Sequence, residues 1–256
     1  MKHTATHHIL VFLAILSGAE AFVSSWHQVR RRCTTVVVYA GRKDTCDVAV
    51  FGGGFGGLYT ALAISRNARK QKKRVDVALV DPQDQFVFLP LLYDLTEGTA
   101  TPAEVCPYYK DILADTGVRH IKGTFNDFSA SDLHSANVTS YNDDITLSFR
   151  SSVVAVGATP ESILASVRGA SDLVQPFYTQ RDAEATRELL KSLEAQISIH
   201  GSKPRIAIVG GGFGGVELAA CVKRRLREAD VTLLTRGPPM AGTRAEPLVD
   251  LSLIHI

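Results

Sequence analysis

The chain of 256 residues is 45% hydrophobic, and its 28 Lys or Arg against 26 Asp or Glu give a formal net charge of +2. This composition is globular with enough apolar material for a core, and it excludes fibrous, low-complexity and disulfide-scaffold proteins. No basic face is concentrated enough to indicate nucleic acid as a partner. The four cysteines, Cys33, Cys46, Cys106 and Cys221, form no C-x-x-C pair, so neither a metal site nor a redox-active dithiol is expected.

The first 44 residues are predicted to be a targeting presequence. The apolar run Ile9–Leu16 and the Ala19-x-Ala21 pattern are typical of a signal peptide cleaved before Phe22, and the run is too short to span a membrane. Residues 22–43 carry five Arg or Lys and no acid, as transit peptides do. The combination resembles the bipartite plastid presequence of algae with secondary plastids, so a plastid location is expected. A mitochondrial address, an ordinary signal peptide or a membrane anchor remain as alternatives.

An internal repeat organises the rest of the chain. Asp47–Ala63 and Arg205–Cys221 share an apolar run, the hexapeptide GGGFGG and a series of helix formers. The apolar runs predict strands buried on both faces of a parallel sheet, followed by helices over 57–70 and 214–228. Second strands are predicted over 75–80 and 231–234. The expected fold is therefore α/β, with two Rossmann-like, doubly wound dinucleotide-binding domains of the glutathione-reductase type.

Each hexapeptide has the glycine spacing that a pyrophosphate requires. The first glycine permits a tight turn, the second lets backbone N–H groups approach the ligand, and the third lets the helix pack closely on its strand. The helix N-terminus then favours the anion through its unpaired N–H groups and its dipole. Two copies in the full strand–turn–helix–strand context predict two dinucleotide sites.

The residues after the two second strands differ. Asp81 can accept hydrogen bonds from the hydroxyls of a ribose, which suits FAD. The second site has Thr235 and Arg236 instead of a carboxylate, and Arg can pair with a 2′-phosphate. The second site is therefore expected to bind NADPH, or to accept NADPH and NADH; an exposed loop arginine without a role is the alternative.

Three further elements are predicted between the repeats. Gly117–Thr124 is a candidate strand, and residues 133–150 form a candidate hairpin with its turn at Asn142-Asp143-Asp144. Thr179 and Asp182 form a possible capping box that opens a helix reaching about Gln196.

The run from Phe86 through Leu95, followed by Gly98, resembles a motif of the type II NAD(P)H:quinone dehydrogenases. With GGGFGG upstream and Asp182-Ala183 downstream, the resemblance is to the C1 group of plant and algal plastids, over residues 46–236. It implies FAD and NAD(P)H as cofactors, and peripheral attachment to a membrane surface. The implied acceptor is a plastoquinone-like quinone or a naphthoquinone of the phylloquinone pathway. The oligomeric state stays open.

The resemblance also implies roles for individual residues. Pro90 and Leu91 would lie near the isoalloxazine, and Gly157-Ala158 would end a strand that passes the flavin. Glu217 would lie at the junction of nicotinamide and flavin as the catalytic candidate, or it is only a first-turn acid favoured by the helix dipole. Phe149–Ser152 departs from the family pattern, which has an acid there.

The implied chemistry needs no protein nucleophile, because the cofactors carry the electrons. A reductase with another acceptor, such as ferredoxin or monodehydroascorbate, and a non-catalytic dinucleotide-binding protein remain as alternatives. The complete set of residues predicted to contact the two dinucleotides is Gly52, Gly53, Gly54, Phe55, Gly56, Gly57, Asp81, Pro82, Pro90, Leu91, Gly157, Ala158, Gly210, Gly211, Gly212, Phe213, Gly214, Gly215 and Arg236.

The predicted domains are an FAD domain over 45–175 and the first part of an NAD(P)H domain over 176–250, so the fold is expected to be incomplete at its C-terminus. The final LSLIHI, residues 251–256, matches one reading frame of a transposon-end sequencing adapter and is expected to be non-native; a truncated paralogue is the alternative. As given, the chain is expected to bind both ligands weakly or not at all, and to aggregate through an exposed sheet edge.

Overall fold

The structure, a computed structural model, describes residues 9–14, 42–158 except 131 and 142, and 167–241. The chain divides into two compact units. The first-repeat unit comprises Ser25–Phe88 and Cys106–Ala158, and the second-repeat unit comprises Met1–Ser24, Leu89–Val105 and Thr159–Ile256. The α/β class and the Rossmann-like arrangement of each unit are as predicted.

The first-repeat unit contains a six-stranded sheet of order β4-β3-β2-β7-β6-β5. Its strands are β2 (Arg42–Phe51), β3 (Val77–Asp81), β4 (Val118–Lys122), β5 (Thr124–Phe128), β6 (Ser135–Thr139) and β7 (Asp144–Val154). The four strands β4, β3, β2 and β7 run parallel, whereas β6 is antiparallel to both β5 and β7. The strand β2 therefore lies between β3, which follows it in the chain, and β7, which returns from the other side.

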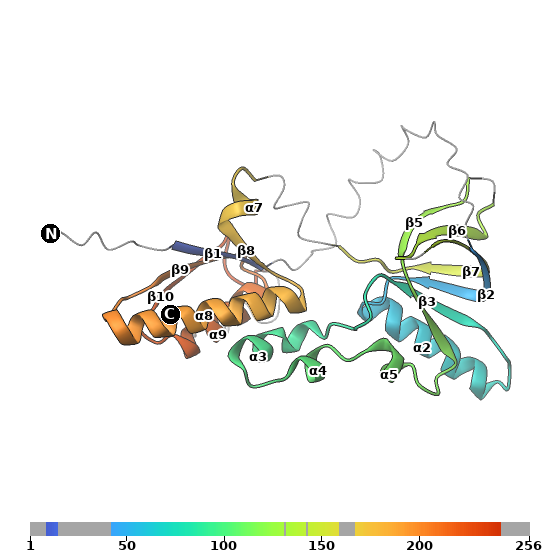
Figure 1. Ribbon diagram of the computed structural model, residues 1–256, viewed down its shortest axis with the longest axis horizontal. Helices are drawn as coiled ribbons and strands as arrows, with labels where there is room; N and C mark the ends of the chain where they lie inside the picture. The colour runs from blue at the N-terminus through green and yellow to red at the C-terminus, as the bar shows by residue number, and fades with distance from the viewer. Residues whose placement is uncertain (1–8, 15–41, 131, 142, 159–166, 242–256) are drawn as a thin grey trace. The chain divides into compact units, whose positions relative to one another are not determined.

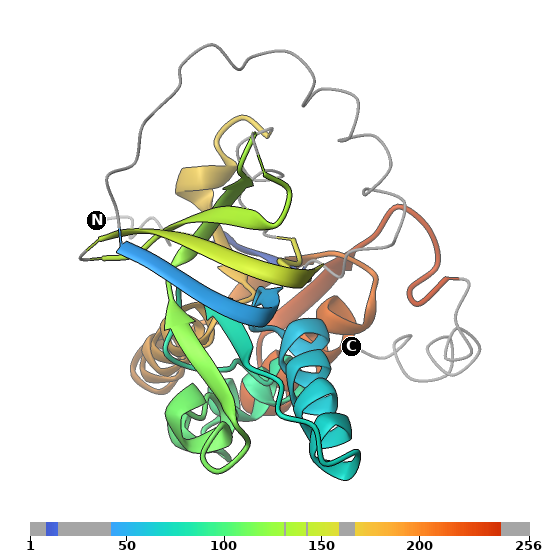
Figure 2. The same cartoon turned by 90° about the vertical axis from the view of Figure 1, so that its right-hand side faces the viewer.

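The apolar residues of β2 alternate between two cores. Val50 packs with Leu58 and Leu79 on the face covered by helix α2 (Phe55–Lys70). Phe51 packs on the other face, where its ring stacks on Phe125 with centroids 4.3 Å apart. Because both faces of β2 are buried, its sequence is a continuous apolar run and does not alternate between apolar and polar residues. Figure 2 shows β2 leading directly into α2.

The second-repeat unit contains a four-stranded parallel sheet of order β10-β9-β1-β8. Its strands are β1 (Ile9–Ala14), β8 (Val174–Phe177), β9 (Arg205–Val209) and β10 (Asp230–Leu234). The long helices α8 (Gln180–His200) and α9 (Phe213–Arg225) lie along one face of this sheet in Figure 1. The short helices of the unit are η1 (Leu89–Leu91), α3 (Leu92–Glu97), α4 (Pro102–Val105) and α7 (Ala170–Leu173). Helix α5 (Tyr109–Ile112) belongs to the first-repeat unit.

The two compact units do not divide at residue 175, where the domain boundary was expected. Helix α3 packs on α8 and α9: Arg225 donates to the Thr96 carbonyl over 2.8 Å, and Arg224 pairs with Glu97. These contacts group Leu89–Val105 with the second repeat, whereas it was expected in the FAD domain. The strand β8 also belongs to the second sheet, although Val174 and Gln175 were expected in the FAD domain.

Two stretches of the predicted presequence lie in strands. The segment Ile9–Ala14 forms β1 between β8 and β9, and β2 begins at Arg42 rather than after residue 44. A short apolar run suits a strand buried in a parallel sheet as well as it suits a signal peptide, and the pattern alone does not separate them. The fold thus includes residues that were expected to lie outside it. Residues 1–8 and 15–41 lie outside the described part, and targeting stays a prediction.

Most predicted elements are confirmed, with shifted ends. Strand β4 and the β6–β7 hairpin are present, although Asn142 of the expected turn lies outside the described residues. Helix α8 opens with the predicted capping box of Thr179 and Asp182, but it ends at His200, because Gly201 (φ +59°) is the first residue to adopt the left-handed conformation. Helix α9 ends at Arg225, three residues earlier than predicted. The predicted segments 242–250 and 251–256 lie outside the described residues.

Candidate dinucleotide-binding sites

The first glycine loop lies where three parallel strands end. The Gly52 N–H donates to the Val80 carbonyl of β3 over 2.8 Å, and the Ala155 N–H after β7 donates to the Phe51 carbonyl over 2.7 Å. The loop is therefore held between the carboxyl ends of β3 and β7. This is the edge at which open α/β sheets bind ligands, at the point where the strand order reverses.

At three positions of this loop, glycine is favoured for a different geometric reason each time. Gly52 has φ +99°, and a Cβ on it would lie 2.3 Å from the Ala155 carbonyl oxygen. A Cβ on Gly57 would lie 1.7 Å from the Gly52 carbonyl oxygen, so only glycine lets α2 start this close to β2. A Cβ on Gly54 would meet no atom within 4 Å, which leaves that side open to a ligand. The pattern fits a pyrophosphate at the N-terminus of α2.

Asp81 lies at the end of β3, facing the loop. One carboxylate oxygen accepts the Gly53 N–H over 2.6 Å, and the other accepts the Gln83 N–H over 2.8 Å. An ionised carboxylate offers about four lone-pair positions, so it can still accept hydroxyl groups of a ribose. Pro82, which follows Asp81, is exposed at the same edge.

The phenylalanine of the first hexapeptide supports the start of α2. Phe55 contacts Phe86 and Phe88, with ring centroids 5.1 Å and 5.3 Å away. Its ring is nevertheless 36% exposed, so it also presents apolar surface beside the loop. The two phenylalanines of the segment that resembles a family motif thus pack against the first glycine loop.

The second glycine loop repeats this geometry. The Gly210 N–H donates to the Leu234 carbonyl over 2.9 Å, and Gly210 has φ +128°. A Cβ on Gly215 would lie 1.8 Å from the Gly210 carbonyl oxygen. Gly212 is the N-cap of α9, as Gly54 is of α2, and Phe213 is exposed at the first helical position. Both loops can therefore present backbone N–H groups to a diphosphate.

The two loops place Thr235 where the first site has Asp81. Each residue directly follows the one whose carbonyl accepts the first glycine N–H, Val80 in one site and Leu234 in the other. The Thr235 methyl group would lie 2.7 Å from a Cβ on Gly211. Arg236 comes next and is exposed. The second site thus has no carboxylate at this position, as predicted from the sequence.

The remaining residues predicted to contact the flavin lie in two separate segments. Gly157 and Ala158 are exposed two and three residues after Ala155, which borders Gly52. Pro90 and Leu91 belong to the other unit, in η1, so their place near a flavin stays a prediction.

Glu217 lies in the second turn of α9, since the first turn contains no acidic residue. The interpretation of Glu217 as a first-turn acid stabilised by the helix dipole is therefore wrong. Burial raises the pKa of Glu217, and a hydrogen bond from the Tyr93 hydroxyl partly opposes this shift. The Tyr93 ring also packs on Phe177, with centroids 5.3 Å apart. The partnership of Tyr93 with Glu217 was not predicted, because Glu217 lies 124 positions after Tyr93 in the sequence.

The sequence matches the family model described as pyridine nucleotide-disulphide oxidoreductase over residues 46–249. The chain belongs to the pyridine nucleotide-disulphide oxidoreductase family. It is 35% identical over 193 residues to the alternative NAD(P)H-ubiquinone oxidoreductase C1, chloroplastic/mitochondrial, of Arabidopsis thaliana, covering 72% of this chain and 37% of that protein. It is 36% identical over 204 residues to the demethylphylloquinone reductase NdbB of Synechocystis sp., covering 78% of this chain and 48% of that protein.

Among solved structures, the NDH2 of Plasmodium falciparum in complex with NADH is similar in fold, with a TM-score of 0.66 and 20% identity. The match covers 84% of this chain and 46% of that one. The resemblance to type II NAD(P)H:quinone dehydrogenases of the C1 group is confirmed by these relatives. The chain spans less than half the length of each of these relatives.

Burial disfavours the thiolate form of two described cysteines, Cys46 and Cys221. Burial raises the pKa of the Cys46 thiol to about 11 and that of the Cys221 thiol to about 12. Both are therefore protonated near neutral pH and are poor nucleophiles. Cys106 is buried, and Cys33 lies outside the described residues.

Within the described ranges, no group of three metal-ligating side chains occurs, and no helix is long and apolar enough to cross a membrane.

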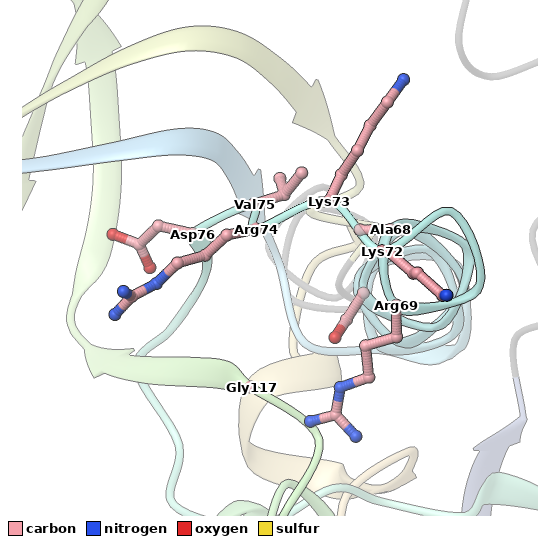
Figure 3. A pocket seen from close by; sticks show the side chains of 9 residues that line it. Ala68, Arg69, Lys72, Lys73, Arg74, Val75, Asp76 and Gly117 are labelled. Carbon is pink, nitrogen blue, oxygen red and sulfur yellow. The ribbon is translucent and has the colours of Figure 1, made fainter.

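A basic pocket of about 560 Å³ lies at the opposite end of α2 from the glycine loop (Figure 3). Its residues are Ser65, Ala68, Arg69, Lys72, Lys73, Arg74, Val75, Asp76 and Gly117. Figure 3 shows Lys73 pointing away from Arg69, so the cations do not converge on one point. Arg69 donates to the Asp115 carbonyl, and Asp76 pairs with Arg119 over 3.2 Å. Cations at a helix C-terminus are favoured by its dipole, which accounts for this cluster without a ligand.

Tyr109 and His120 support the first glycine loop and were not predicted. The Tyr109 hydroxyl donates to the Gly53 carbonyl over 2.8 Å, and its ring lies on that of His120 with centroids 4.7 Å apart. A ring nitrogen of His120 lies 3.3 Å from the Asp81 carbonyl oxygen. No motif in the sequence signals these contacts, because 56 residues separate Tyr109 from Gly53.

Proposed function

We propose that the natural protein containing this chain is an FAD-dependent NAD(P)H:quinone oxidoreductase with a plastoquinone-like acceptor. The observation that carries the proposal is the pair of equivalent glycine loops whose neighbouring strands end differently, in Asp81 and in Thr235-Arg236. Two dinucleotides of different kinds are needed for such a reaction. When bound, the flavin accepts a hydride from NAD(P)H and passes two electrons to the acceptor.

FAD is assigned to the first loop and NADPH or NADH to the second. Asp81 faces its loop and retains lone pairs for ribose hydroxyls, which supports the adenosine half of FAD there. A carboxylate at the second strand end would repel a 2′-phosphate, whereas Arg236 beside the uncharged Thr235 can pair with it. This supports NADPH as the preferred donor. Glu217 is proposed to face the nicotinamide, with Tyr93 setting the orientation of its carboxylate.

The acceptor and the location rest on the relatives. Their names mention ubiquinone, demethylphylloquinone and a chloroplast, and quinones with long tails reside in membranes. A peripheral enzyme on a plastid membrane is consistent with these names and with the presequence pattern.

Absorbance spectroscopy of the natural protein tests this function. The purified protein is expected to show a flavin spectrum that NADPH bleaches and a quinone such as decyl-plastoquinone restores. Bleaching without recovery by any quinone, but with recovery by ferredoxin, would replace the proposed acceptor. Absence of bound flavin after reconstitution with FAD would contradict the enzymatic assignment altogether.

A substitution at Arg236 tests the donor preference. Because a hydrogen-bonded pair between a charged side chain and a phosphate contributes about 1.5–3 kcal/mol, Arg236→Ala should lower kcat/KM for NADPH about tenfold or more. The value for NADH should change less than about twofold. Arg227→Ala is the matched control, since Arg227 is an exposed arginine of the same unit. Equal losses with both nucleotides would show that Arg236 does not read the 2′-phosphate.

A further inference from the structure

The backbone on both sides of Gly53 is fixed by groups from elsewhere in the fold. The Gly53 N–H donates to the Asp81 carboxylate over 2.6 Å, and the Gly53 carbonyl accepts the Tyr109 hydroxyl over 2.8 Å. Gly53 is not one of the three glycines of the G-x-G-x-x-G pattern. Its need for glycine has a different cause: a Cβ there would lie 2.1 Å from the Tyr109 hydroxyl oxygen.

The direction of one N–H group follows from these contacts. The described peptide bonds are trans, so the Gly54 N–H points opposite to the Gly53 carbonyl. That carbonyl turns toward Tyr109, whose side chain is buried. The Gly54 N–H must therefore turn away from the core. A Cβ on Gly54 would find no atom within 4 Å, so the space beside the Gly54 Cα is open.

The second repeat holds the same carbonyl with a different donor. Gly211 occupies the position of Gly53, and its carbonyl accepts the Met240 backbone N–H over 2.7 Å. The equivalent peptide unit is thus fixed in both glycine loops, by a different donor in each. The shared feature is the orientation of the following amide, whereas the donor is a main-chain group in one repeat and a side chain in the other.

Tyr109 is itself held in place. Its N–H donates to the Asp84 carbonyl over 2.9 Å, and the Phe86 N–H donates to the Pro107 carbonyl over 2.9 Å, so α5 is tied to the loop after β3. Its ring rests on His120. Burial raises the pKa of the Tyr109 hydroxyl, which therefore stays protonated and available as a donor.

We propose that Tyr109 is a positioning residue for the first dinucleotide site: its hydroxyl holds the Gly53 carbonyl so that the Gly54 N–H faces the diphosphate of the ligand. The inference rests on the proposed assignment of FAD to this loop. It predicts an effect confined to ligands that carry a diphosphate, because the adenine and ribose are recognised elsewhere.

The test is Tyr109→Phe in the natural protein stripped of flavin, with FAD, ADP and adenosine as the probes. Without the Tyr109 hydroxyl, the Gly54 N–H is no longer held toward the diphosphate, and its hydrogen bond to this anion is weakened. FAD and ADP should therefore bind about five- to tenfold more weakly than to the wild type. Adenosine binding should change less than about twofold. Tyr141→Phe, at a tyrosine that is 96% exposed, is the matched control. A Tyr109→Phe protein that binds FAD as tightly as the wild type, or that loses adenosine and ADP equally, overturns the proposal.

Gly53→Ala gives a second route if Tyr109→Phe fails to fold. The added Cβ displaces the Tyr109 hydroxyl without removing it, so weaker ADP binding is expected here too. Unchanged ADP binding would contradict the role of Tyr109. If the wild-type protein binds no FAD, the proposed function fails together with this inference; if it binds FAD and both variants bind it equally, only this inference fails.

Discussion

At the residue scale, the two sites differ most at a single position, Asp81 in one and Thr235 in the other. A Thr accepts at one oxygen and carries no charge, whereas a carboxylate can serve both a backbone N–H and a ribose. The difference is visible in the sequence, because both residues directly follow a predicted strand. What the sequence does not reveal is that the Asp81 carboxylate already accepts the Gly53 N–H.

Asp81→Asn should weaken FAD binding about tenfold or more. The amide keeps one oxygen for the Gly53 N–H but loses the charge and half of the acceptor capacity that two ribose hydroxyls require. The FAD dissociation constant, measured by flavin fluorescence during reconstitution of the natural protein, reports the loss. Asp84→Asn is the control, since Asp84 is three residues away and pairs with Lys122. Equal effects of the two variants would show that only the net charge matters.

His120 makes the stability of the first-repeat unit depend on pH. Burial lowers the pKa of His120 below its usual 6.5, although the Asp81 carbonyl partly opposes this. The unfolded chain therefore binds a proton at a higher pH than the folded chain does. The part of the unfolding free energy that depends on neutral His120 is fully present above pH 6.5. It is lost as the pH falls from 6.5 through the pKa of His120 in the folded protein.

His120→Gln should remove this part of the pH dependence. Urea unfolding of the natural protein at pH 7.5 and at pH 5.5 measures the difference in unfolding free energy between the two conditions. The wild type should lose more stability on acidification than the variant does. His134→Gln, on a histidine of the same unit, should behave as the wild type. Parallel losses in wild type and His120→Gln would contradict the assignment.

At the element scale, predictions succeeded where the signal is local. The start of α8 follows from Thr179 and Asp182, whose reciprocal hydrogen bonds use residues three apart. The start of α2 follows from the glycine turn. Strand β5 was missed because its partners, not its own pattern, place it: it pairs with β6 and buries Phe125 against β2. Strand β1 was assigned to a presequence for the same reason, since only its neighbours β8 and β9 distinguish a strand from a leader.

The capping box of α8 should contribute measurably to stability. Thr179→Ala removes the side-chain acceptor for the Asp182 N–H, which lies 3.1 Å away, and should lower the free energy of unfolding by about 1 kcal/mol. Ser192→Ala, at an exposed position of the same helix, should be neutral or slightly stabilising, because Ala favours helix more than Ser does. Denaturant unfolding of both variants gives the comparison. A Thr179→Ala protein as stable as the wild type would show that the helix start is held by packing alone.

At the scale of the whole molecule, the repeat predicts two sites, and each unit contains one glycine loop with its own strand ends. The supporting contacts that complete the sites come from distant parts of the chain: Tyr109 reaches Gly53, and Tyr93 reaches Glu217. Neither pair shares a motif, a period or a spacing that a sequence pattern could reveal. The glycines were predictable because their constraint is steric and local, whereas the positioning residues depend on how α5 and α3 pack.

Because each unit contains its own loop, the two ligands should protect separate parts of the molecule. Hydrogen exchange of the natural protein with FAD should slow the amides of residues 52–57 and 155–158, and NADPH should slow those of residues 210–215 and 235–240. The protection follows from mass action, since a ligand that binds only the folded unit stabilises it by RT ln(1 + [L]/Kd). FMN, which lacks the AMP half of FAD and therefore carries a single phosphate, is the control and should protect residues 52–57 much less than FAD does. If NADPH protected residues 52–57 as strongly as FAD does, the assignment of the two loops to different dinucleotides would be wrong, because a loop beside Asp81 should not favour a ligand with a 2′-phosphate.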